Sequence, residues 1–115
     1  MPPGQMTTTE LETAILERLA KERGIPTLAQ KQLHVLSRKF TGVGSFTEFR
    51  QGIALPDLSD GPLSLGAIIS VPGVPHGLGA VLFVEAGYPK CLEVFAFGEE
   101  LWDGTADGFH FSSAA

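Results

Sequence analysis

Cysteine is nearly absent from this sequence, since Cys91 is the only one among 115 residues. No disulfide can form within the chain, which fits a reducing compartment, so we expect a cytoplasmic protein. Long apolar runs are also missing. No stretch approaches the roughly 18 consecutive apolar residues that span a bilayer, and residues 1–9 lack the basic and apolar segments of an export signal. The sequence therefore predicts neither membrane insertion nor export.

Basic residues are scarce as well. The chain has 8 Lys and Arg against 13 Asp and Glu, a net charge of −5. Nucleic acid is an unlikely partner for such a chain, because neutralising phosphates requires clustered basic side chains. Residues 1–50 hold seven basic and five acidic side chains, whereas residues 51–115 hold one and eight. We therefore expect any charged partner to meet an acidic C-terminal side.

The composition that remains is typical of one folded unit. Hydrophobic residues make up 43% of the chain and charged residues 18%, which is too apolar for a disordered segment. We interpret residues 1–115 as a single domain, with a loose leader over residues 1–6 and a tail over residues 103–115.

Helical signals are confined to the first third of the chain. Thr7 with Glu10 and Thr9 with Glu12 both have capping-box spacing. Apolar residues follow at helical intervals and Gly24 supplies a stop, so a helix is predicted over about 9–23. Residues 27–32 are a candidate for a short second helix. From residue 33 onward, β-branched and aromatic runs alternate with Gly and Pro, which predicts strands at about 34–41, 44–51, 65–71, 78–86 and 90–97.

The predicted fold class is therefore α+β, with an N-terminal helix packed on an antiparallel meander sheet of about five strands. Residues 52–64 are predicted to form a loop, and an edge strand is expected near residues 109–111. The strands at 78–86 and 90–97 are apolar on both faces, yet one helix covers only one face of a sheet. The second face must be covered by sheet curvature, by the 52–64 loop or by another copy of the chain. We favour a homodimer.

No motif for catalysis, a metal or a cofactor is present. His34, His76 and His110 share no metal-ligand spacing, and the two Gly-x-Gly sequences lack the third glycine and the following helix of a dinucleotide site. We expect no cofactor and no metal. Cys91, in an apolar run, is interpreted as an inert small hydrophobe rather than a nucleophile.

Three features remain open between a structural and a functional role. Arg38 and Glu93 each lie in an apolar run, and we expect a buried ion pair between them; alternatively, Glu93 is an acid or base in a pocket with Arg38 and His76. His76 lies in a turn rich in proline, either as a recognition residue or by chance. Trp102, with Glu99, Glu100 and Asp103 around it, is either an exposed anchor for a partner or a residue that caps the core.

Residues 37–49, 77–84 and 91–98 carry a resemblance. Arg38 followed by Thr-Gly-x-Gly and aromatic residues, a later Gly-rich apolar strand, and a Leu-Glu motif ending in an aromatic residue and Gly make segment 37–102 similar to a group of short uncharacterised bacterial proteins. No activity is attached to that group. The resemblance implies only that Arg38, Gly42, Gly44 and Glu93 belong to a recurring pattern.

The leading hypothesis is a small, dimeric, non-enzymatic interaction module that meets a protein partner through its acidic C-terminal side. An immunity-type inhibitor of a basic toxin is one concrete version. The alternative is a small enzyme or ligand-binding protein whose pocket uses Glu93, Arg38 and a histidine.

Overall fold

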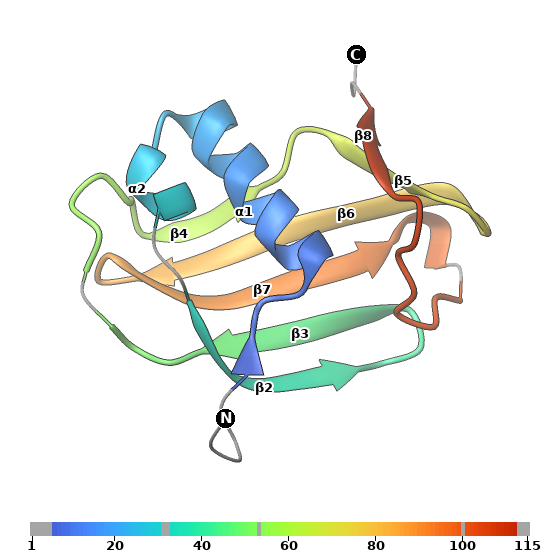
Figure 1. The fold of residues 1–115 in the computed structure, drawn as a ribbon, viewed down its shortest axis with the longest axis horizontal. Coiled ribbons are helices and arrows are strands. Elements are labelled where there is room, and N and C mark those ends of the chain that lie inside the picture. Colours follow the sequence, from blue (N-terminus) through green and yellow to red (C-terminus); the bar gives the residue numbers. More distant parts are fainter. Residues whose placement is uncertain (1–5, 31–32, 53, 100, 113–115) are drawn as a thin grey trace.

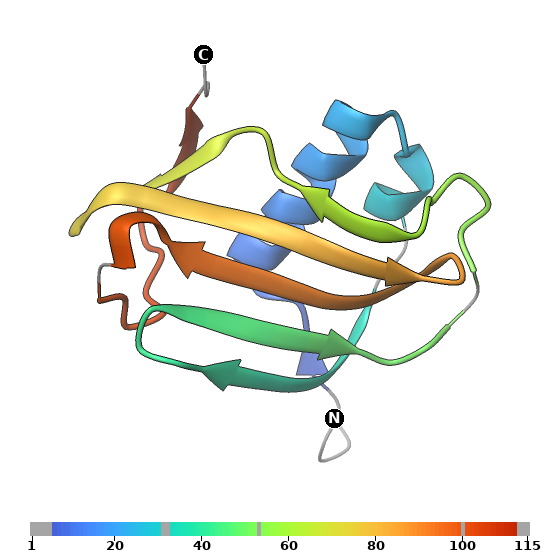
Figure 2. The same cartoon turned by 180° about the vertical axis from the view of Figure 1, so that it is seen from behind.

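In the computed structural model, residues 6–30, 33–52, 54–99 and 101–112 are described. Across these residues, two helices lie on one side of an antiparallel sheet (Figure 1). Seen from behind, the second side of the sheet has no helix over it within the ranges just given (Figure 2). The predicted α+β class, with an N-terminal helix on an antiparallel sheet, is confirmed.

Helix α1 (Glu10–Arg23) is capped at both ends by residues next to it in the sequence. The Thr9 hydroxyl accepts a hydrogen bond from the Glu12 amide at 3.1 Å, and the Glu12 carboxylate accepts one from the Thr9 amide at 2.9 Å. This reciprocal cap satisfies two amides that the first turn leaves without partners. Gly24 ends the helix in the left-handed conformation, with φ of 67°. The short α2 (Pro26–Gln30) follows, and the last two residues of its predicted range lie outside the described residues.

The sheet contains eight strands within the described part of the chain, in the order β1-β2-β3-β7-β6-β5-β8, with β4 also paired to β6. The strands are β1 (Met6–Thr7), β2 (His34–Phe40), β3 (Gly44–Phe49), β4 (Gly61–Ser64), β5 (Ile68–Val71), β6 (Val74–Glu85), β7 (Tyr88–Ala96) and β8 (His110–Ser112), and a 3-10 turn, η1 (Phe97–Glu99), follows β7. Strand β8 is the edge strand expected near residues 109–111.

The predicted meander of about five strands matches this eight-stranded sheet only in part. Strand β3 pairs with β7 rather than with the next strand along the chain, so residues 50–60 must cross to the far edge of β6. There β4 and β5 occupy one edge of β6 in succession, which is possible because β6 is 12 residues long. The predicted loop at 52–64 therefore contains a strand. Its four residues include a proline, and a short edge strand of that kind gives no periodic signal.

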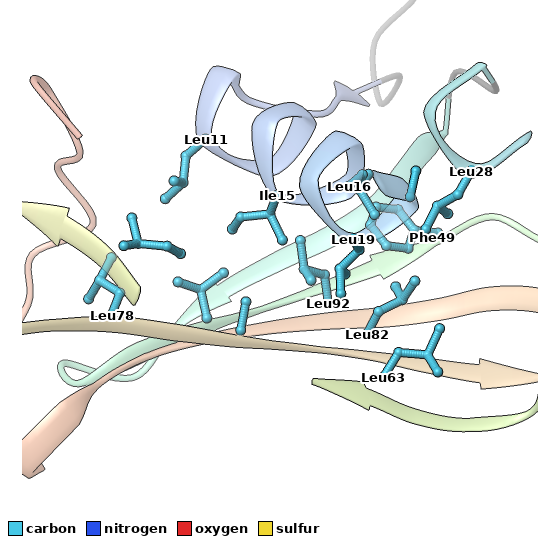
Figure 3. Packing of buried hydrophobic residues seen from close by; sticks show 14 of the residues in the cluster. Leu11, Ile15, Leu16, Leu19, Leu28, Phe49, Leu63, Leu78, Leu82 and Leu92 are labelled. Atoms are coloured by element: carbon cyan, nitrogen blue, oxygen red, sulfur yellow. The ribbon is translucent and has the colours of Figure 1, made fainter. Parts of the chain in front are cut away.

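One apolar core lies between the helices and the sheet (Figure 3). The face of α1 toward the sheet is fully or almost fully buried, as are the strand residues below it. Each such leucine or isoleucine stabilises the fold by about 1.5–3 kcal/mol through burial. The residues labelled in the core are Leu11, Ile15, Leu16, Leu19, Leu28, Phe49, Leu63, Leu78, Leu82 and Leu92.

The described residues of the 52–64 segment, which exclude residue 53, do not cover the second face of the sheet. Its Leu55 and Leu58 are buried in the same core cluster as the α1 residues, and Asp60 accepts a hydrogen bond from the Gly87 amide in the β6–β7 turn. We call the side of the sheet away from α1 the open face.

Candidate functional site

The open face carries a group of aromatic side chains. Strand register directs Phe46, Phe83 and Phe95 to this side, because their neighbours along each strand point into the core. Phe97 of η1 joins them. Phe46, Phe83 and Phe97 are 38–39% exposed, so large apolar surfaces here contact water.

Gly79 on β6 makes room for two of these rings. A Cβ at this position would lie 2.7 Å from the Cζ atoms of both Phe95 and Phe97. The two rings lie edge to face, with centroids 5.4 Å apart, an arrangement that aromatic pairs favour. Side chains of the open face therefore cover part of it themselves, which the sequence pattern did not predict.

Charged residues accompany the aromatic residues on the open face. Lys39 is aligned with Phe46, and Phe46 is aligned with Glu93 on the next strand. Two residues further along the strands, on the same face, Glu48 is aligned with Cys91. Burial raises the pKa of the half-buried Cys91 thiol, and the negative charges of Glu48 and Glu93 raise it further. The thiol therefore stays protonated at neutral pH, as expected for an inert cysteine.

The predicted ion pair between Arg38 and Glu93 is wrong. Arg38 is aligned with Thr47, which is aligned with Leu92 in the core, so Arg38 lies on the helix side of the sheet. Glu93 is the next residue along β7 and points to the open face, since side chains alternate along a strand. Arg38 instead pairs with Glu12 of α1, at 2.6 Å from Nη2 to Oε1.

The Glu12 carboxylate is saturated with donors. Its Oε1 accepts from the Thr9 amide and from Arg38 Nη2, while its Oε2 accepts from Arg38 Nε and from the Thr47 hydroxyl, both at 2.8 Å. Glu12 is 4% exposed. Burial alone would raise its pKa, but the hydrogen bonds from Arg38, Thr9 and Thr47 together lower the pKa below the usual range. Four filled acceptor positions leave this carboxylate no capacity to act as a base.

A cavity of about 190 Å³ lies beside this cluster, between the first turn of α1, the helix side of the sheet and the C-terminal segment. Aromatic side chains, the Arg38 side chain and acidic groups all line it. The lining residues are Thr9, Glu10, Leu11, Glu12, Arg38, Phe40, Ser45, Val94, Trp102, Gly104, Ala106, Asp107 and Phe109.

The pocket proposed from the sequence, with Glu93, Arg38 and a histidine, is not assembled. Of its members only Arg38 lines the cavity. His34, His76 and His110 lie on β2, β6 and β8 and are exposed. Within the ranges that the structure describes, no group of three His, Cys, Asp or Glu residues is placed to hold a metal ion.

Trp102 belongs to the core and not to the exposed surface. It is 5% exposed, its amide donates to the Gly42 carbonyl at 2.9 Å, and its indole Nε1 donates to the Thr105 carbonyl at 2.9 Å. Of the two alternatives for this residue, the capping role describes it. Asp103 next to it is exposed, and hydrogen bonds from Thr105 lower its pKa. Glu99 lies in η1, and Glu100 lies outside the described residues.

Comparisons with known proteins found no matching family model, no matching curated protein and no matching solved structure. The resemblance of segment 37–102 to short bacterial proteins therefore stays a prediction. No helix among the described residues is long and apolar enough to cross a bilayer.

Proposed function

We propose that this chain is a small, non-enzymatic interaction module of the cytoplasm that acts as a homodimer, with the open faces of two copies packed together. The observation that supports this proposal is the group of half-exposed phenylalanines on a sheet face that no helix of the described residues covers. Exposed apolar groups of this kind mark association surfaces. The saturation of Glu12 favours a binding role over a catalytic one.

Charge on the open face favours a second copy as the occupant. Lys39 and Glu93 flank Phe46 on opposite sides in one row across the sheet. A two-fold axis parallel to the strands and above Phe46 would place Lys39 of each copy over Glu93 of the other, which gives two equivalent ion pairs. Such self-complementarity is what a symmetric dimer requires.

The size of the face indicates a weak dimer. Strand spacing and rise give roughly 400 Å² of flat surface per copy. The total is then at the low end of the sizes of specific interfaces, where complexes are transient. We therefore expect an association that is reversible and depends on concentration.

Sedimentation equilibrium over about 5–200 µM tests this proposal, because a weak dimer dissociates on dilution across that range. Phe46→Lys should give a monomer, whereas Leu101→Lys should not, although Leu101 is 83% exposed. Lys39→Glu and Glu93→Lys should each weaken the dimer, and the double reversal should restore it. A wild-type monomer at every concentration would reject the proposal, and dissociation by Leu101→Lys would place the interface elsewhere.

A second partner is proposed on the acidic C-terminal side, where an immunity-type inhibitor would meet a basic protein. Leu101 is 83% exposed and, together with the exposed Asp103, lines a shallow pocket of about 500 Å³. Gly42, Pro72 and Thr105 also line this pocket. An apolar anchor beside a carboxylate suits a basic, partly apolar partner. A partner isolated from the native host should lose affinity on Leu101→Ser and, in a salt-dependent way, on Asp103→Asn. A partner that tolerates both substitutions would place the contact elsewhere.

A further inference from the structure

The 190 Å³ cavity lies on the side of the sheet away from the proposed dimer face, and its lining includes hydrogen-bond donors that have no partner among the described residues. Ser45 is 4% exposed and lines it, yet its hydroxyl makes no hydrogen bond within the described part of the chain. Arg38 uses Nε and Nη2 on Glu12 and on the Thr7 carbonyl, which leaves Nη1 unused among the same residues. Neither donor is sealed from solvent, since the only buried side-chain polar atom without a partner among the described residues is Thr27 Oγ1. Both donors are therefore available to an acceptor that enters the cavity.

The first turn of α1 adds two more donors to this cavity. The Thr9 hydroxyl caps the Glu12 amide, and the first bond of the helix ladder runs from Thr13 to Thr9. The amides of Glu10 and Leu11 have no partner in the described residues, and both residues line the cavity. Amides at this position point out of the end of the helix and attract the oxygens of an anionic group.

Acidic side chains at one end of the cavity exclude a simple anion. Glu10 and Asp107 are exposed and line the cavity. They also line an adjoining concave surface together with Glu17, and neither Arg38 nor Ser45 lines that second surface. Arg38 is already neutralised by Glu12, so the free charges around the cavity are negative. A ligand that offers a carboxylate to the donors must therefore also offer a cation to Glu10 and Asp107.

Aromatic residues form the remaining wall. Phe40 and Trp102 lie edge to face with centroids 6.4 Å apart, and Phe109 completes the wall. Gly104 lies against the Phe40 ring, where a Cβ would come within 2.5 Å of it. A cavity of this size is comparable to the roughly 150 Å³ that accommodates benzene, so the apolar part of the ligand must be small.

From this juxtaposition we infer that the cavity binds a free α-amino acid with a small apolar side chain. The carboxylate takes the donors of Arg38, Ser45 and the α1 amides, the ammonium group meets Glu10 and Asp107, and the side chain packs on the aromatic wall. An α-amino acid carries both charged groups on one carbon, so a single small ligand can offer a carboxylate to the donors and an ammonium group to the acidic residues that line the same cavity.

Trp102 is the only tryptophan in the chain, so its fluorescence and its indole N–H signal in NMR report on this cavity directly. The probe is leucine, with 4-methylpentanoate, 3-methylbutylamine and leucinamide as analogues that lack the ammonium group, the carboxylate or the negative charge. Leucine should shift the Trp102 signals in a saturable way. Each analogue should bind about tenfold more weakly or worse, because one set of charged hydrogen bonds is lost.

Three variants test the assignment without touching the Glu12 pair. Ser45→Ala and Asp107→Asn should each weaken leucine binding about tenfold, whereas Asp103→Asn, a carboxylate outside this cavity, should leave it unchanged. No response of Trp102 to leucine or to other small apolar amino acids would overturn the inference. Equal binding of 3-methylbutylamine would also overturn it, since the cavity would then be a cation site, and equal binding of 4-methylpentanoate would make it an anion site.

Discussion

Arg38 donates two hydrogen bonds to the Glu12 carboxylate, 2.8 Å from Nε and 2.6 Å from Nη2, and so joins β2 to the first turn of α1. Both side chains are largely buried, at 17% and 5% exposed. The pair joins two elements that are separated by 26 positions in the sequence. Its energetic value is therefore open to a direct test.

Glu12→Gln should lower the free energy of unfolding by about 3–5 kcal/mol, because it leaves a buried guanidinium without its counter-charge. The double variant Glu12→Gln with Arg38→Met should recover part of the loss. Urea denaturation measures both changes. Glu93→Gln is the matched control and should change stability little, since Glu93 lies on the open face. A large coupling energy between Arg38 and Glu93 would contradict the register described above.

Acid should destabilise the fold through Glu12. Its pKa is lower in the folded protein than in the unfolded chain, so its contribution is complete above the ordinary carboxyl pKa and disappears as pH falls through the folded pKa. The urea midpoint should therefore fall as pH drops from about 5 to about 2. Thr47→Val removes one donor to Glu12, raises its pKa and should make that slope shallower. Parallel slopes for the two proteins would show that Glu12 does not contribute.

Cys91 should react slowly with a thiol reagent at neutral pH. Burial and the charges of Glu48 and Glu93 raise its pKa, and only the thiolate is nucleophilic. Glu48→Gln removes one of these charges and should accelerate labelling, while the protein unfolded in urea should label at the rate of an ordinary thiol. Wild-type labelling as fast as that of the unfolded chain would contradict this prediction.

Two glycines of the open face should respond differently to alanine. A Cβ at Gly44 would overlap the Val94 carbonyl oxygen, which is part of the backbone. The atoms nearest to a Cβ at Gly79 belong instead to the tips of the Phe95 and Phe97 rings. Gly44→Ala should therefore destabilise by about 1–3 kcal/mol or more, and Gly79→Ala by less. Gly52→Ala meets nothing within 4 Å and serves as the control. Thermal unfolding ranks the three, and an equal effect of Gly44→Ala and Gly52→Ala would contradict the close contact between β3 and β7.

The sequence by itself determined the features that depend on neighbouring residues. Spacing limited the reciprocal cap to Thr7 with Glu10 or Thr9 with Glu12, and the structure has the second pair. Gly24 marked the end of α1. The positions of the longer strands followed from apolar runs between turn residues. Strand β4 was missed because four residues with a proline carry no period.

Only the tertiary structure decided which residues meet across long distances in the chain. The apolar run around Arg38 indicates that the guanidinium needs an acidic partner, but not whether that partner lies on the sheet or on the helix. The register of β2 on β3 directs Arg38 toward Glu12 and away from Glu93. The burial of Trp102 and the donors around the cavity likewise arise where α1, β3 and the C-terminal segment converge. Side chains alternate along a strand, so a register set by distant pairings decides which face, and therefore which partner, each residue has.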